Sequence, residues 1–365
     1  MRARDANKVA QMSTAQPIHK QMAQQAAEAA HASRAEADRL LNEIGPGDNV
    51  EIGSGSESEG EHVGIDVDSH NHATRVKTIQ QVYIAGYKID TWYYSPLPEC
   101  YHNTQCVYFC EFCLDFFKCF EDLERHMQCN CKFRHPLGNE IYRHKYEDGR
   151  ELGVFEIDGQ TQRVYCENLC YFAKLFLDHK TLQYDVTCFY FYMIGQWDEF
   201  GFHLIGYYSK EKVSAKDYNL ACILCLPHQQ RKGYGKFIIA FSYELSLKEG
   251  KTGTPERPFS DLGKASYRAW WLEKLLEILI QRKADADAGL CDNVISIKEI
   301  SDMTSIMADD IIGTLDEAGL LLFHNGMYLL NMNEEQLPKL KKLAGRPGVP
   351  VHRASVMWTK AEYPR

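Results

Sequence analysis

The amino-acid sequence predicts an α+β fold in three parts, and three observations support this prediction. Period-two alternation of apolar residues begins near residue 77 and indicates strands. Two apolar runs flank a turn at 198–201, and a further strand, a glycine-containing loop and a helix follow them. Near the C-terminus, helical patterns precede two short strands. We therefore expect a central core, an N-terminal β subdomain and a C-terminal winged-helix-like subdomain.

Length and composition exclude several classes of protein. The chain has 365 residues, of which 45% are hydrophobic and 25% are charged, enough for one large core or for two to three modest domains. It has no run of about 18 apolar residues and no N-terminal secretory signal, so we expect no membrane span and an intracellular location. Fifty acidic residues outnumber 41 basic ones, giving a net charge of −9. This sign favours a basic partner over nucleic acid.

Residues 1–76 are expected to form a disordered acidic tail. Residues 1–72 contain 6 basic and 12 acidic residues and therefore carry −6 of the net charge. The Ala- and Gln-rich piece at 21–43 has almost no large apolar face to bury, so it would not fold alone. We expect fixed structure only from about residue 77.

The central elements follow from alternation and helical spacing. Strands are predicted within 77–98, and runs 187–197 and 202–210 are predicted to form a β-hairpin. A third strand is expected at 219–226, followed by a helix at 233–249.

The C-terminal part is predicted to consist of helices followed by a hairpin. An amphipathic helix is expected at 267–283, with shorter helices in 295–305 and 307–319. Two strands follow, joined around Asn325 and Gly326, a residue pair that tolerates the positive φ angles of a tight turn.

Four residues have the spacing and chemistry of a structural zinc site. Cys110, Cys113 and His126 match the first three ligands of a Cys-Cys-His finger, and zinc prefers four thiolate or imidazole ligands. For the fourth ligand we choose Cys131, with Cys129 as the alternative. We therefore expect one structural Zn²⁺ in this segment.

Neither the finger nor the winged-helix-like part has the positive charge that is typical of DNA-binding modules. Between Cys110 and His126 lie five acidic and two basic residues. The segment 296–318 contains six acidic residues and one basic residue, Lys298. Because phosphate would repel both segments, we expect no sequence-specific DNA binding.

The loop at 230–236 has the composition of a phosphate-binding turn. It reads QRKGYGK, follows a strand and opens a helix, so small residues would let backbone N–H groups approach a pyrophosphate. Glycine also serves turn geometry alone, so this pattern by itself is a weak indication.

Further motifs make the chain from about residue 77 to residue 358 resemble the MYST family of lysine acetyltransferases. The motifs are KIDTWYYSPLP (88–98), HPLGNEIYR (135–143), NLCYFAKLFLDHKTLQYDV (168–186), GYYSKEK (206–212), ACILCLPHQQRKGYGKFIIAFSYELS (221–246) and TPERPFSDLGKASYRAWW (254–271). The resemblance implies a GNAT-like core that binds acetyl-CoA. Expected subdomains are a β and zinc-finger part at 77–165, the catalytic core at 166–283 and the winged-helix-like part at 284–365.

The resemblance also implies roles for individual residues. Glu256 in TPERP falls on the family's general base, which must deprotonate a lysine of pKa about 10.4. Cys222 falls on the active-site cysteine, and Lys174 is matched to an autoacetylated lysine. For Cys222 we favour a role in lining the pocket during direct attack in a ternary complex, with covalent acetylation as the alternative. The residues expected to bind acetyl-CoA are Ile223, Leu224, Cys225, Gln230, Arg231, Lys232, Gly233, Tyr234, Gly235, Lys236 and Ser260.

These matches imply a nuclear histone acetyltransferase that acts on core histone tails in nucleosomes, with histone H4 as the first target, inside a multisubunit complex. The departures from the family pattern are Cys225 for a common Thr, Ala269 for a Ser, and an extra residue between His126 and Cys131. Two alternatives are a non-catalytic zinc-finger and winged-helix chromatin protein, and an acetyltransferase acting mainly on non-histone proteins.

Overall fold

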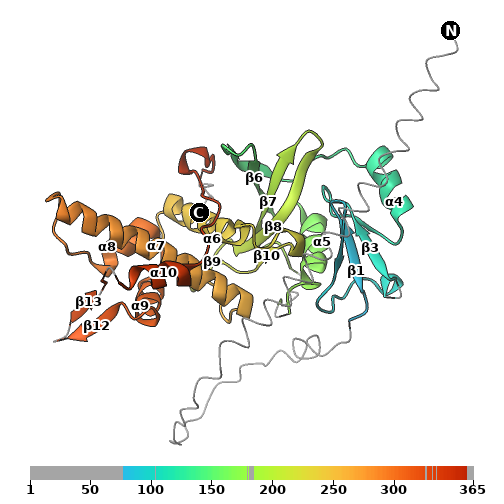
Figure 1. The fold of residues 1–365 in the computed structure, drawn as a ribbon. Helices are drawn as coiled ribbons and strands as arrows, with labels where there is room; N and C mark the ends of the chain where they lie inside the picture. Colours follow the sequence, from blue (N-terminus) through green and yellow to red (C-terminus); the bar gives the residue numbers. More distant parts are fainter. Residues whose placement is uncertain are drawn as a thin grey trace, which may run out of the picture.

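The computed structural model describes residues 77–102, 104–178, 180, 185–324, 327–330, 332–333 and 335–359. The tail predicted at 1–76 and the turn predicted at Asn325 and Gly326 lie outside the described residues. Figure 1 shows an N-terminal sheet, a central sheet and a group of C-terminal helices arranged side by side. Among the described helices, none combines the length and apolar composition needed to cross a membrane.

The N-terminal sheet contains the predicted strands of segment 77–98. Strands β1 (Gln81–Ile84) and β2 (Tyr87–Asp90) form an antiparallel hairpin. Strand β3 (Cys106–Phe109) pairs in parallel with β1 and antiparallel with β4 (Phe116–Phe117), and helix α4 (Phe120–Arg125) follows. The sheet order is β2-β1-β3-β4.

An antiparallel five-stranded sheet of order β10-β8-β7-β6-β5 forms the centre of the molecule. Its strands are β5 (Asn139–Lys145), β6 (Glu151–Asp158), β7 (Phe189–Asp198), β8 (Gly201–Glu211) and β10 (Ile223–Cys225). The pair β7–β8 confirms the hairpin predicted around 198–201.

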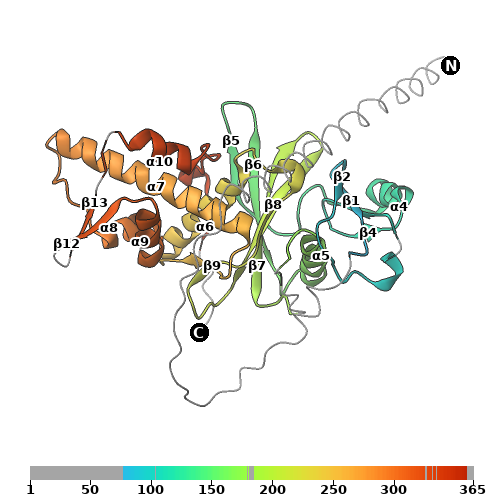
Figure 2. The ribbon, with the colours of Figure 1, turned by 60° about the horizontal axis from the view of Figure 1, so that its bottom comes forward.

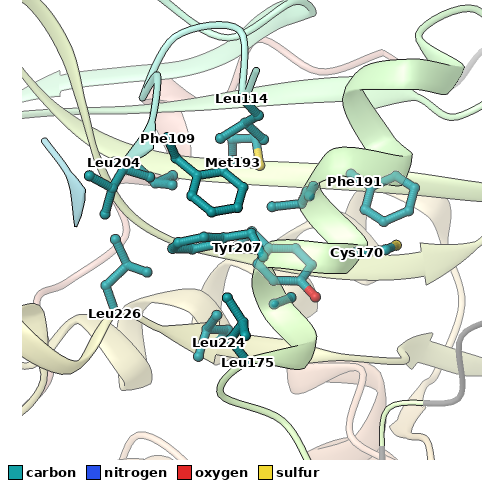
Figure 3. Close-up of a cluster of buried hydrophobic side chains, with 14 of the residues drawn as sticks. Phe109, Leu114, Cys170, Leu175, Phe191, Met193, Leu204, Tyr207, Leu224 and Leu226 are labelled. Carbon is teal, nitrogen blue, oxygen red and sulfur yellow. The ribbon is translucent and has the colours of Figure 1, made fainter. Parts of the chain in front are cut away.

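One helix covers each face of this sheet, as Figure 2 shows. Helix α5 (Arg163–Lys174) packs on one face together with the N-terminal sheet. Helix α6 (Tyr234–Glu249), predicted at 233–249, packs on the other face. Figure 3 shows the α5 side of the core around Tyr207, where side chains from the N-terminal sheet, α5 and β7, β8 and β10 meet.

The C-terminal part has the predicted order of helices followed by a hairpin. Helix α7 (Asp261–Asp287) begins earlier than the predicted 267, because the Ser260 hydroxyl caps it by accepting the Gly263 N–H at 3.1 Å. Helices α8 and α9 and the strand pair β12–β13 follow, and α10 was not predicted. These elements are α8 (Ile297–Thr304), α9 (Ala308–Glu317), β12 (Leu321–His324), β13 (Met327–Leu330) and α10 (Leu337–Ala344).

Elements of secondary structure cross the subdomain boundaries expected at 165 and 283. Strands β5 and β6 lie within the expected N-terminal subdomain, yet they pair with β7 in the central sheet. Helix α7 continues through residue 283. Alternation in a sequence identifies a strand but not the sheet that the strand joins.

Candidate active site and zinc site

The four predicted zinc ligands converge at one place. The ligand atoms of Cys110, Cys113, His126 and Cys131 all lie within 4.8 Å of one another. The sulfurs of Cys110 and Cys131 are 3.8 Å apart, the spacing of about 3.8 Å that tetrahedral geometry with Zn–S bonds of about 2.3 Å requires. The residues therefore fit a structural Zn²⁺.

A π-helical turn accommodates the extra residue before the fourth ligand. Residues His126–Asn130 form this turn, and the Cys131 N–H donates to the His126 carbonyl at 2.7 Å, an i to i−5 hydrogen bond. Cys131 is buried beside the other ligands, whereas Cys129 is exposed. The structure therefore places Cys131, and not Cys129, with the other three predicted ligands.

The zinc segment is attached to the central hairpin by an ion pair. Glu111, between the first two ligands, is buried and accepts a hydrogen bond from His203 Nδ1 of β8 at 3.0 Å. The Phe202 N–H also donates to the Arg134 carbonyl at 2.9 Å. Order in the zinc segment is thus coupled to order in β8.

A β-bulge positions Cys222. The strand predicted at 219–226 is divided into β9 (Tyr218–Leu220) and β10, and Ser209 of β8 faces both Ala221 and Cys222. Its carbonyl accepts the Ala221 N–H at 2.7 Å, its N–H donates to the Cys222 carbonyl at 2.9 Å, and its hydroxyl accepts the Cys222 N–H at 3.1 Å. Ala221 and Cys222 thus lie opposite the single residue Ser209, which is the arrangement of a β-bulge. A bulge of this kind changes the direction of the side chains on its strand, here that of Cys222.

Lys180 lies beside Cys222, a neighbour that the sequence analysis did not identify. Its Nζ is 3.7 Å from Cys222 Sγ. Burial opposes the charge on Lys180, but its interactions with Cys222, Tyr207 and Cys170 raise its pKa well above the ordinary value. The only signal in the sequence was its place in the LDHK motif that supported the family resemblance.

A backbone hydrogen bond holds Glu256 next to β9, the strand that precedes Cys222. Glu256 follows β11 (Thr254–Pro255), which pairs in parallel with β9, and its N–H donates to the Leu220 carbonyl at 2.8 Å. The residue is exposed, yet partial desolvation raises the pKa of its carboxyl, and nearby Glu211 raises it further. Lys180 and Lys216 act in the opposite direction. A carboxylate with a raised pKa is suited to accept a proton near neutral pH.

Lys174, the lysine expected to be autoacetylated, does not lie beside Cys222. It is 3% exposed on α5, and its ammonium donates to the Asp178 carbonyl. Burial lowers its pKa. The structure therefore brings Lys180 rather than Lys174 to Cys222, because α5 directs the Lys174 side chain into the protein.

Strand β10 stands at the end of the central sheet, with one backbone edge directed away from β8. The Leu226 N–H donates to the Ile205 carbonyl at 2.9 Å, and Leu224 lies opposite Tyr207. In an antiparallel ladder, alternate residues bond to the neighbouring strand, so Leu224 faces β8. The backbone groups of Ile223 and Cys225 face the outer edge.

The loop after β10 has the geometry of an anion-binding turn. Arg231 and Gly233 have positive φ values of 63° and 88°, and Gly233 precedes the first turn of α6. A Cβ at Gly235 would meet no atom within 4 Å, so space lies open beside this turn. Gln230 Nε2 closes the loop onto the Cys225 carbonyl at 3.0 Å. Tyr234, the first residue of α6, is buried. The loop thus fits a phosphate group.

Two lysines that were predicted to bind acetyl-CoA donate hydrogen bonds to other residues of the protein. Lys236 Nζ donates to Glu273 Oε2 at 2.5 Å and to the carbonyls of Ala344 and Arg346 at 2.7 and 2.9 Å. Lys232 Nζ donates to Gln229 Oε1 at 3.0 Å. The backbone N–H groups of the loop are therefore better placed to bind a phosphate than the ammonium of Lys236, which already has three partners.

Comparison with known families identifies the chain. The sequence profile of the MOZ/SAS family matches residues 135–353. The chain belongs to this family. The profile of the MYST family zinc finger domain matches residues 76–131 and ends on the predicted ligand Cys131.

Several MOZ/SAS relatives carry names that state an activity. "Histone acetyltransferase of the MYST family 2" of Arabidopsis thaliana is 50% identical over 290 residues, which are 80% of this chain and 62% of the relative. "Histone acetyltransferase ESA1" of Saccharomyces cerevisiae is 42% identical over 288 residues, which are 79% of this chain and 61% of the relative. The chain thus spans about three fifths of the length of these relatives.

Proposed function

We propose that this MOZ/SAS family protein is a protein-lysine acetyltransferase that uses acetyl-CoA to acetylate core histone tails, with histone H4 as the first target. The observation that supports it most is the convergence on β9 and β10 of a carboxylate with raised pKa, Glu256, and a thiol, Cys222. A loop suited to phosphate, 230–236, follows the same strand. The names of the relatives agree with this proposal.

In this proposal Glu256 is the general base. It removes a proton from the ammonium of the substrate lysine, because only the neutral amine is a nucleophile. Bound acetyl-CoA supplies an activated acetyl group as a thioester. Cys222 lines the pocket without carrying the acetyl group, so that the amine reacts directly in a ternary complex.

The expected cofactor residues are divided between the strand edge and the loop. Ile223 and Cys225 would offer outward backbone groups to the pantetheine arm, and Leu224 would contribute less, because it faces β8. The loop from Gln230 to Lys236 would hold the pyrophosphate, mainly through backbone N–H groups at the start of α6. Ser260, which caps α7, would contact the cofactor with its remaining hydrogen-bonding capacity.

Lysine-rich tails of nucleosomal histones suit an acidic protein of net charge −9. We further propose a nuclear location and membership of a multisubunit complex, without sequence-specific DNA binding. The autoacetylation expected at Lys174 suits Lys180 better, since Lys180 lies beside Cys222.

At the level of the fold, we propose that the central core is GNAT-like. The strand pair β9–β11, the position of β10 at the edge of the central sheet and the glycine loop before α6 support this. Helices α8 and α9 with the hairpin β12–β13 support a winged-helix-like module. The subdomains at 77–165, 166–283 and 284–365 remain our division of the chain, with the β5–β6 hairpin contributing to the core sheet.

The decisive experiment is incubation of the full chain with labelled acetyl-CoA and single core histones, followed by mass spectrometry. Label on lysines of histone H4 tails, lost in Glu256→Gln, is the expected result. Label on non-histone proteins alone would support a different substrate class. No label on any protein would contradict the proposed activity.

A further inference from the structure

A cavity of about 250 Å³ lies beside β9, on the α6 side of the central sheet. Its walls come from the start of β7, the end of β8, the start of β9, the end of α6 and Trp358 near the C-terminus. We call it the β9 cavity. Small-molecule sites usually measure about 300–1,000 Å³, so this volume suits one side chain better than a free cofactor.

The charges on the wall favour a cation over an anion. Four carboxylates line the β9 cavity, those of Glu156, Glu211, Asp217 and Glu249. Three lysines also line the cavity: Lys210 is paired with Glu249, Lys212 is paired with Asp158 at 2.6 Å, and Lys251 is exposed, so carboxylates outnumber lysines by four to three. Among the described residues, Glu211 has no salt-bridge partner, so it can accept an incoming cation.

The rest of the wall also suits a basic side chain. Asn219 is 4% exposed, and its Nδ2 donates to Ser246 Oγ at 3.2 Å, while its Oδ1 accepts no hydrogen bond from the described residues. Aromatic rings complete the lining, and one already holds a cation, since Lys212 Nζ is 5.1 Å from the centre of the Tyr190 ring. Ammonium and guanidinium groups are attracted to such faces.

The β9 cavity adjoins the candidate active site. Tyr218 and Asn219 in its wall precede Leu220, whose carbonyl accepts the Glu256 N–H. Glu211 in its wall is close enough to Glu256 to interact with its carboxyl electrostatically. A polypeptide that offers one lysine to Glu256 therefore passes near this cavity.

We propose that the β9 cavity is a specificity subsite that binds a second basic side chain of the acceptor polypeptide, with Glu211 as the carboxylate that pairs with it. This inference rests on the proposed acetyltransferase function and adds a requirement for the residue sequence around the acetylated lysine. An extended peptide advances at most about 3.6 Å per residue, so basic residues within four positions of the lysine reach about 14 Å in either direction.

The test uses peptides that contain one lysine and one arginine. The arginine occupies each position from four before to four after the lysine, and the reference peptide has alanine there. We compare kcat/KM of each arginine peptide with that of the reference in the wild-type full chain and in Glu211→Gln. The ratio cancels any effect of the substitution on chemistry. Glu199→Gln is the matched control, because Glu199 is exposed near the other end of the β7–β8 hairpin.

For the wild type we expect one or two arginine positions to raise the ratio about three- to tenfold, as for a partly buried ion pair with a hydrogen bond. The ratio falls toward one in Glu211→Gln and is unchanged in Glu199→Gln. A flat positional profile, or a preference that survives in Glu211→Gln, overturns the subsite.

If no peptide is acetylated, the proposed function fails, and fluorescence anisotropy of labelled peptides still tests the subsite. Equal affinities of wild type and Glu211→Gln for every arginine peptide then overturn it. Weaker binding by Glu211→Gln at one position alone supports it.

Discussion

The ammonium of Lys180 lies 3.7 Å from the sulfur of Cys222, although the two residues are 42 positions apart in the chain. Lys180 also interacts electrostatically with Glu256, Tyr207 and Cys170. The ammonium of Lys180 thus interacts with both the thiol and the carboxylate of the candidate active site. Its charge favours the ionised form of Glu256, while partial desolvation and Glu211 oppose it.

Glu256→Gln should lower kcat by about 10²- to 10⁴-fold near pH 7, the usual contribution of a general base. Affinity for acetyl-CoA should change little, because the cofactor is expected to bind at the β10 edge and the loop 230–236. Steady-state rates and isothermal titration with acetyl-CoA measure the two effects. Full activity of this variant would exclude Glu256 as the base.

The acidic limb of the pH profile of kcat/KM should respond in opposite directions to two neighbours of Glu256. The base must be ionised, so activity rises with pH through its raised pKa. Lys180→Met removes a charge that lowers this pKa, so the limb should move to higher pH. Glu211→Gln removes a charge that raises it, so the limb should move to lower pH. Shifts in the same direction would contradict the assignment of the limb to Glu256.

The zinc site should contain one zinc atom per chain, and the Cys110→Ser, Cys113→Ser double variant should lose it. Unfolding should accompany the loss, since Glu111 in the same segment is paired with His203 of β8. Atomic absorption and circular dichroism measure both. Cys129→Ser is the matched control and should keep its zinc, because Cys129 is exposed and outside the cluster. A zinc-free native protein would refute the site.

His228 should reduce stability in acid. It is 7% exposed, stacks on Tyr87 with ring centres 4.1 Å apart, and neither ring nitrogen has a partner among the described residues. Burial, with a contribution from Lys232, lowers its pKa to about 3. Its unfolded pKa is about 6.5, so between these values the unfolded chain binds the extra proton and stability falls as pH falls.

This contribution amounts to about 1.4 kcal/mol per pH unit within that window. The variant His228→Phe keeps the stacking and removes the titration, so its urea midpoint should fall less between pH 6.5 and pH 5 than that of the wild type. His352→Gln, at an exposed position, is the control. Equal pH dependence of the wild type and His228→Phe would show that His228 is not buried in its neutral form.

Incubation of the full chain with acetyl-CoA alone should label Lys180 and leave Lys174 unlabelled. The Lys174 amine is buried and bonded to the Asp178 carbonyl, whereas Lys180 lies beside Cys222. Peptide mapping by mass spectrometry distinguishes the two. Preferential label at Lys174 would contradict this prediction and support the autoacetylation of Lys174 that the family resemblance implied.

Local features were predictable because their cause is local. The spacing of Cys110, Cys113 and His126 is set within one short segment, and the alternation around 198–201 specifies a hairpin whatever surrounds it. Spacing favoured Cys131 as the fourth ligand but left Cys129 open as the alternative. The structure separates the two cysteines through the π-helical turn at His126–Asn130, after which Cys131 lies with the other predicted ligands.

The amino-acid order alone determined the zinc ligand types, the β7–β8 hairpin, the glycine turn before α6 and the family to which the chain belongs, because each depends on neighbouring residues. Tertiary packing alone decided which distant groups meet. It brought Lys180 to Cys222, buried Lys174, turned Lys236 to Glu273, and joined β5 and β6 to the core sheet. Such contacts depend on how helices and sheets are stacked, and periodicity within a segment carries no information about the partner on the other side of the interface.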